Sequence, residues 1–159
     1  MSRADSVSYT IEMTATAHAV IGTVIAAKIG NPTLAFPIAL SSHILADLIP
    51  HWDTAYDSET KDRKRIFIET VGDVILGFSL SYSIIVFLFP QTNLIYAFLM
   101  IIMAQFPDWL FAPYYFFGWK SFKWAYEFGK NTNMNLDKPW GIFTQIATVG
   151  AVILLGKIF

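Results

Sequence analysis

Residues 66–89 read IFIETVGDVILGFSLSYSIIVFLF, an apolar run whose ionisable side chains occur only near its start. A helix needs about 20 mostly apolar residues to cross the hydrocarbon core of a bilayer, so this run is long enough to span it. Its apolar residues follow one another without the alternation of a strand, which excludes a transmembrane barrel. Pro90 ends the run, and the turn-forming residues Gln91, Thr92 and Asn93 separate it from the next one.

Four more apolar runs lie on either side of this one. Together they predict an all-α, polytopic membrane helix bundle with about five transmembrane helices and one interfacial segment, forming a single domain over residues 1–159. The short connections between the first and second runs, and between the third and fourth, argue for antiparallel hairpins. The expected helices are residues 13–29, 33–49, 66–89, 94–117 and 139–158, with a cytoplasmic loop at 51–65 and an interfacial segment at 118–138.

The composition also indicates lipid as the main solvent. Of the 159 residues, 55% are hydrophobic and only 14% are charged, with a mean hydropathy of +0.48. Soluble domains average about 25% charged residues. The net charge of −1 gives no reason to expect nucleic acid as a partner. The absence of cysteine excludes disulfides, thiol catalysis and thiolate metal ligands, so any metal must be held by nitrogen and oxygen.

The basic residues predict the orientation of the chain in the membrane. With five spans, Lys28 and Lys157 are the only two of the eleven Lys and Arg residues that fall on the side opposite the N-terminus. Because positive charge gathers on the cytoplasmic side, we expect the N-terminus to be cytoplasmic, in a bacterial-type inner membrane. His18 interrupts the first apolar run, so we expect a mature helix there and not a signal peptide.

Residues 42–53 read SHILADLIPHWD and carry the most informative polar side chains. An ionisable residue inside a span costs about 2.5–3.5 kcal/mol on insertion scales and usually has a function. His43, Asp47 and His51 are spaced by four, which places them on one face of a continuous helix. Asp53 follows just past the expected end of that helix. The sequence therefore predicts a functional site at this level of the bundle.

Polar residues from the other expected helices fall at a similar depth. His18, Asp73 and Asp108 lie about 8–14 Å from the same side, at a rise of about 1.5 Å per residue. Imidazole and carboxylate together suit zinc, manganese or iron. We therefore expect one or two divalent ions, with zinc favoured and manganese and iron as alternatives. The expected metal ligands are His18, His43, Asp47, His51 and Asp73.

The remaining polar residues suggest roles in catalysis and substrate binding. Asp53 and Asp108 are the candidate catalytic residues, as a general base or as further ligands. The basic run contains Arg63, Lys64 and Arg65, which we expect to hold a substrate phosphate. A solvated surface or a contact with lipid headgroups is the alternative for these three cations.

A family resemblance rests on these same residues. The Thr16-Ala17-His18 segment with Gly22, the spacing from His43 to Asp53, and Phe106-Pro107-Asp108 resemble the YdjM-like small bacterial inner-membrane proteins, which are described as metal-dependent hydrolases. The resemblance covers the first two expected helices well and the rest more loosely. The chain lacks the His-Arg-Gly and Thr-His-Ser elements of the longer members. The resemblance implies ligand roles for His18, His43, Asp47, His51 and Asp108.

Three functions follow as hypotheses. The first is a metal-dependent hydrolase that acts on a lipid-linked phosphoester at the cytoplasmic interface, with membrane lipid as its partner and a homo-oligomer left open. The second is a divalent-cation or proton transporter or channel that uses the same His and Asp residues, which predicts polar residues continuing toward the far side. The third is a haem protein with His18 and His43 as axial ligands, which the nearby carboxylates disfavour.

Overall fold

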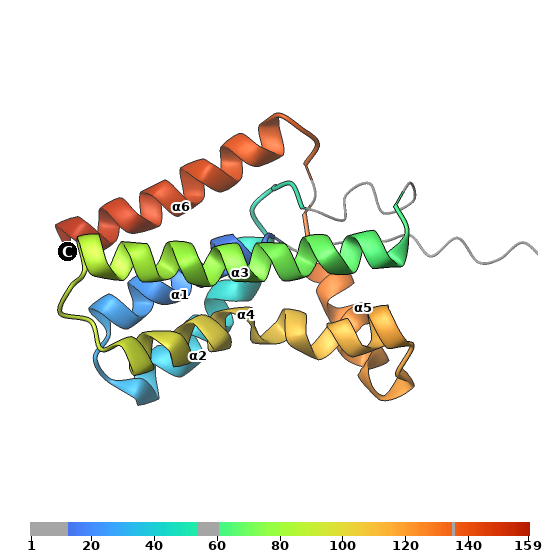
Figure 1. Cartoon of the computed structure of the whole chain (residues 1–159), viewed down its shortest axis with the longest axis horizontal. Coiled ribbons are helices and arrows are strands. Elements are labelled where there is room, and N and C mark those ends of the chain that lie inside the picture. The colour runs from blue at the N-terminus through green and yellow to red at the C-terminus, as the bar shows by residue number, and fades with distance from the viewer. Residues whose placement is uncertain (1–12, 54–60, 135) are drawn as a thin grey trace, which may run out of the picture.

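The computed structural model describes residues 13–53, 61–134 and 136–159, and the elements of these residues are helices (Figure 1). The prediction of an all-α fold is confirmed for this part of the chain. The helices are α1 (Ala15–Lys28), α2 (Pro32–Asp47), α3 (Arg63–Leu88), α4 (Leu94–Phe117), the 3-10 helix η1 (Lys120–Phe122), α5 (Lys123–Thr132) and α6 (Trp140–Ile158).

Three of these helices, α3, α4 and α6, are long and apolar enough to cross a membrane. The prediction of about five spans is therefore supported for three helices only. α1 has 14 residues and α2 has 16. At about 1.5 Å per residue both fall short of a hydrocarbon core of about 30 Å. The cause is local, because α1 starts only after its N-cap Thr14 and α2 ends at Asp47, two residues before the expected boundary.

The segments around α3 differ from the expectation in a similar way. α3 begins at Arg63, so the basic residues expected in the 51–65 loop form its first turn. Residues 54–60 of that loop lie outside the described residues. The expected interfacial segment at 118–138 contains η1 and α5, and α5 packs against α4.

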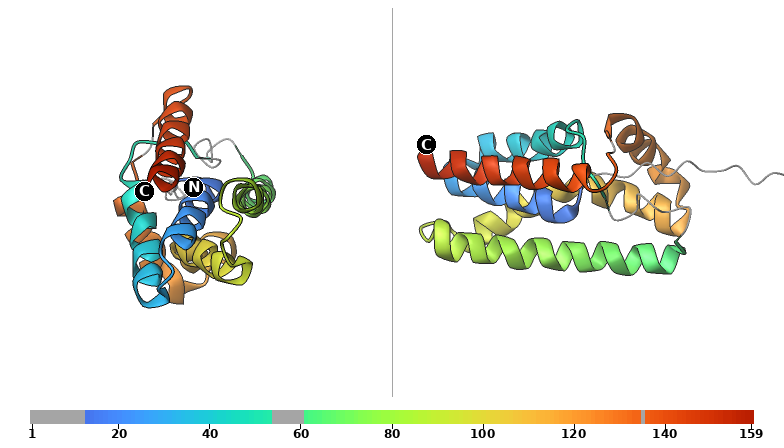
Figure 2. Two further views of the ribbon diagram at one scale, coloured as in Figure 1. Left: turned by 90° about the vertical axis from the view of Figure 1, so that its left-hand side faces the viewer. Right: turned by 90° about the horizontal axis from the view of Figure 1, so that it is seen from above.

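α1 lies in the middle of the bundle and contacts α2, α3, α4 and α6 (Figure 2). Ten of its residues are buried, as expected for a helix that is apolar on all sides. Small side chains make this close packing feasible. A Cβ added at Gly22 would lie 2.8 Å from the carbonyl oxygen of Met100 and 2.9 Å from the Cβ of Ala104. α1 can therefore approach α4 this closely only because residue 22 is glycine.

The ends of the helices lie at two opposite ends of the bundle. The α1–α2 and α3–α4 connections and the C-terminus lie together at one end, on the left of Figure 1. At that end Lys28 and Lys157 both face the ring of Phe89, with Nζ 5.7 and 5.5 Å from its centroid. The start of α3, the end of α4 and α5 lie at the opposite end. The candidate site residues lie between these two ends.

The contact at Gly22 generates a stability prediction. Gly22→Ala should lower the free energy of unfolding by about 1–3 kcal/mol, because the new methyl group overpacks against backbone that cannot move away. Thermal unfolding of the protein in detergent, followed by circular dichroism, measures this change.

Gly150 in α6 provides the matched control, because a Cβ added there meets no atom within 4 Å. Gly150→Ala should leave stability unchanged or raise it by up to about 1 kcal/mol through helix propensity. Equal melting temperatures for the two variants would contradict the close approach of α1 to α4.

Candidate metal centre

Two helices bring three potential ligands together. His18 comes from α1, whereas His43 and Asp47 lie one turn apart on α2. Each residue is about 1% exposed. One ligand atom from each side chain lies within 4.8 Å of the other two. These residues, which we call the His-His-Asp group, could hold a metal ion.

The carboxylate of Asp47 bridges the Nε2 atoms of the two imidazoles. Its Oδ1 is 3.2 Å from Nε2 of His18, and its Oδ2 is 3.2 Å from Nε2 of His43. The two rings stack with their centroids 3.8 Å apart. The backbone N–H of Met13 donates to the same Oδ1 at 2.9 Å. The carboxylate thus connects the start of α1 to the end of α2.

A backbone carbonyl determines the tautomer of His43. Nδ1 of His43 lies 2.7 Å from the carbonyl oxygen of Ala104 in α4, and since a carbonyl only accepts, Nδ1 carries the hydrogen. A neutral ring then presents the Nε2 lone pair toward carboxylate oxygens of Asp47 at 3.2 Å and Asp108 at 3.4 Å. Acceptors that face one another in a buried site repel. A cation between them, either a proton on Nε2 or a metal ion, removes this repulsion.

His51 is buried near this group but is held differently from the sequence prediction. It lies past the end of α2, so it does not continue the helical face of His43 and Asp47. Its backbone pairs with Met134 and Leu136, and its Nδ1 lies 2.7 Å from the carbonyl oxygen of Ile49. Its Nε2 is buried and has no hydrogen-bond partner among the described residues. Burial lowers the pKa of His51, which favours the neutral ring that a metal ligand needs.

Asp73 lies outside the His-His-Asp group and caps α1. Its Oδ2 accepts from the backbone N–H of Ala15 at 2.6 Å, and its Oδ1 accepts from the Thr16 hydroxyl at 2.6 Å. The first N–H groups of a helix have no partner within the helix, so a carboxylate from another helix satisfies them well. The contacts of Asp73 thus fix α3 against the start of α1. The sequence around Asp73 gives no sign of this capping role, because the role depends on how α3 packs against α1.

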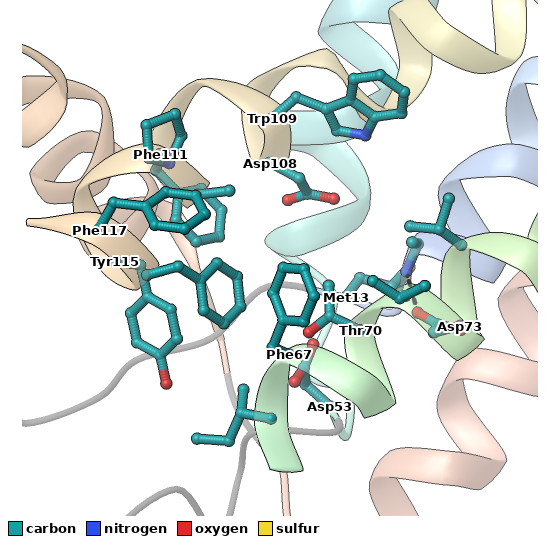
Figure 3. A pocket seen from close by; sticks show the side chains of 17 residues that line it. Met13, Asp53, Phe67, Thr70, Asp73, Asp108, Trp109, Phe111, Tyr115 and Phe117 are labelled. Carbon is teal, nitrogen blue, oxygen red and sulfur yellow. Dashed lines mark hydrogen bonds between the residues drawn. The ribbon is translucent and has the colours of Figure 1, made fainter. Parts of the chain in front are cut away.

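A cavity of about 350 Å³ lies beside the group, between the first turns of α3 and the last turns of α4 (Figure 3). Its wall is mainly aromatic and aliphatic. Asp53 and Asp108 reach toward it from opposite sides in Figure 3, and Asp73 lies at its edge. Asp53 is 6% exposed. The aromatic lining residues include Phe67, Trp109, Phe111, Tyr115, Phe116 and Phe117.

The three expected phosphate-binding cations do not form one cluster. Nε of Arg65 lies 2.9 Å from Glu69, whose other oxygen accepts from Lys61 at 2.7 Å. Lys64 is exposed, and neither it nor Arg65 lines a cavity near the group. Arg63 is also exposed but lines a second cavity.

Two contributors to the site were not predicted from the sequence. The carbonyl of Ala104 and the N–H of Met13 are backbone groups, so the residue types in the sequence do not predict their contacts. Gln105 is fully buried next to Ala104, and its side-chain amide donates to the carbonyl of Ala15 at 3.0 Å. The presence of a buried amide within an apolar run was the only signal for this interaction.

No protein-family model, curated protein or solved structure matches the chain. The chemistry of the centre is therefore inferred from its own geometry.

The sequence predicts that Asp73 is a metal ligand, whereas its hydrogen bonds make it a cap of α1. Substitution of Asp73 distinguishes these two roles. Asp73→Ala should lower the free energy of unfolding by about 1–3 kcal/mol, because it leaves buried donors of α1 without an acceptor. The folded variant should keep its metal. Thermal unfolding and elemental analysis of the same preparation measure both quantities.

His18→Ala is the comparison, because it removes a member of the His-His-Asp group and should abolish metal binding. If Asp73→Ala lost its metal to the same extent while its melting temperature stayed unchanged, Asp73 would be a ligand and the capping role would be wrong.

Proposed function

We propose that the chain is a membrane-embedded, metal-dependent hydrolase that acts on a phosphoester of a lipid. The observation that carries this proposal is the position of the His-His-Asp group beside an apolar cavity whose wall carries further carboxylates. The group provides ligands for a divalent ion, and the cavity suits an apolar chain. The same residues carry the resemblance to the YdjM-like proteins, of which we propose the chain is a member.

The ligand set favours zinc, with manganese and iron as alternatives. His18, His43 and Asp47 supply two nitrogen ligands and one carboxylate, the pattern of catalytic zinc sites that keep one position open. A divalent ion held there supplies Lewis-acid chemistry at a phosphoryl oxygen. Asp108, 3.4 Å from Nε2 of His43, is placed to complete the ligand set or to hold a second ion.

The three carboxylates around the cavity constrain the charge of the substrate. An anionic phosphoester would be repelled by Asp53, Asp73 and Asp108 in a site of low dielectric unless a cation lay between them. A divalent ion removes that repulsion, so metal and phosphate suit each other here. Asp53 reaches into the cavity from the side opposite Asp108 and is the candidate general base that accepts a proton from the attacking water.

Placement in the membrane follows from the lengths of the helices. We propose that α3, α4 and α6 cross the bilayer and that the shorter α1–α2 hairpin inserts between them, which gives five membrane-inserted helices. The basic residues then put the N-terminus and the open end of the cavity on the cytoplasmic side of a bacterial-type inner membrane. An apolar chain could enter the cavity from the bilayer between α3 and α4.

The packing of the bundle favours hydrolysis over transport. A transit route for cations needs polar side chains between the His-His-Asp group and the far end of the bundle. Most of the described buried residues in that half are apolar, and the buried polar side chains there are the hydroxyls of Thr23 and Ser81. The buried hydroxyl of Thr23 donates to the carbonyl of Ala19 in its own helix. One apolar core cluster there consists of Ala26, Ala35, Ala39, Ile85, Ala97, Met100 and Ala104.

Variants of the proposed ligands and base test the mechanism. Asp47→Ala and His43→Ala should lose metal and hydrolase activity together. Asp53→Asn should keep its metal and lower kcat by about 10²–10⁴-fold, because it removes a general base without removing a ligand. Hydrolysis of lipid phosphomonoesters and phosphodiesters in detergent micelles measures activity, and elemental analysis measures metal content.

Asp137→Asn is the control, because Asp137 is an exposed carboxylate outside the cavity. Asp137→Asn should leave the metal content and the hydrolase activity unchanged. Full metal content in Asp47→Ala and His43→Ala would exclude the proposed centre. Metal-dependent flux of zinc or manganese across liposomes, without hydrolysis, would favour the transporter instead.

A further inference from the structure

A second cavity, which we call the basic cavity, adjoins the apolar one. It has a volume of about 520 Å³ and contains three cations and three tyrosines in its lining. Among the described residues, none that lines this cavity is acidic. Tyr115 lines both cavities, so the two are neighbours at the same end of α3 and α4. The lining residues are Arg63, Tyr114, Tyr115, Gly118, Lys120, Lys123 and Tyr126.

The fold brings these cations together from separate parts of the chain. Arg63 is the first residue of α3, whereas Lys120 and Lys123 follow the end of α4. Gly118 terminates α4 with φ 71°, a left-handed conformation that glycine adopts without strain. Its N–H donates to the carbonyl of Tyr114 at 2.9 Å, and the chain then turns into η1. This turn carries Lys120 back beside the start of α3.

The charges of the basic cavity are only partly balanced. Lys123 lies 3.2 Å from Glu127, in a pair that is more than half exposed. Neither Arg63 nor Lys120 has an acidic partner in the described part of the chain. Glu69, near the start of the same helix, is paired with Lys61 and Arg65. Like charges that line one cavity repel, and a bound anion offsets that repulsion.

We propose that the basic cavity binds the phosphate group of an amphiphile whose apolar part extends into the neighbouring apolar cavity. Arginine presents a planar fork that matches two phosphate oxygens, lysine adds a point charge, and tyrosine hydroxyls line the same space. The amphiphile accounts for both cavities at once, because its polar and apolar parts match the two linings.

The position of the basic cavity refines the substrate class, and this step rests on the proposed hydrolase function. Arg63 lines the basic cavity, and none of His18, His43 and Asp47 is among the lining residues of that cavity. A phosphate at Arg63 is therefore separate from the bond that water would attack beside an ion in the His-His-Asp group. The substrate would carry a second anionic phosphate, remote from the phosphoester that is hydrolysed.

Binding can be measured without metal or turnover. The purified protein in a neutral detergent, treated with chelator, is titrated calorimetrically with dihexanoyl phosphatidic acid and with inorganic phosphate. Arg63→Gln and Lys120→Gln should each weaken binding of dihexanoyl phosphatidic acid about tenfold, as expected for the loss of one charge-assisted contact. Inorganic phosphate should bind more weakly, because it leaves the apolar cavity empty.

Lys64→Gln is the matched control, because Lys64 is the exposed neighbour of Arg63 and does not line the cavity. It should leave the affinity unchanged. Equal losses in Lys64→Gln and Arg63→Gln, or no binding by the unmodified protein, would overturn the basic cavity as the site. Equal affinities for inorganic phosphate and dihexanoyl phosphatidic acid would overturn the amphiphile. The Asp47→Asn variant, which lacks a proposed metal ligand, should still bind dihexanoyl phosphatidic acid. A failure of the proposed metal chemistry would therefore leave the binding of this lipid unchanged.

Discussion

The buried carboxylate of Asp47 bridges the Nε2 atoms of His18 and His43, and the centre of the bundle is organised around it. A buried charge of this kind is costly unless it is paired or bound to a metal ion. The surrounding chain supplies partial compensation through the N–H of Met13, and the carbonyl of Ala104 orients His43. Backbone from α4 and from the start of α1 therefore contributes as much to the geometry of the group as the side chains do.

Close helix packing makes this arrangement feasible. α1 can deliver His18 to the centre because glycine and alanine allow it to approach α4, and because Asp73 of α3 accepts from its first turn. The contacts that position His18 thus come from helices other than its own. Next to the group, α3 and α4 diverge enough to leave an apolar cavity and then a basic one. The order from the His-His-Asp group to the apolar wall to the cations suits the amphiphilic phosphate compound that we propose.

The sequence predicted the helical class and the grouping of His18, His43 and Asp47, because polar residues within apolar runs are costly and gather together. It overestimated the number of spans, since hydropathy does not reveal that α1 begins after Thr14 and that α2 ends at Asp47. It assigned Asp73 to the metal because a cap between helices has no local pattern. The proximity of Arg63 and Lys120 could not be predicted from the sequence either, because it depends on the turn at Gly118.

The most direct test of the account is elemental analysis of the protein purified in detergent without added chelator, combined with X-ray absorption spectroscopy at the edge of the metal found. The account predicts about one or two divalent ions per chain, held by nitrogen and oxygen ligands that include imidazole. A folded chain that contains no stoichiometric metal would contradict it. In that case a proton on Nε2 of His43 would be the cation that the buried carboxylates require.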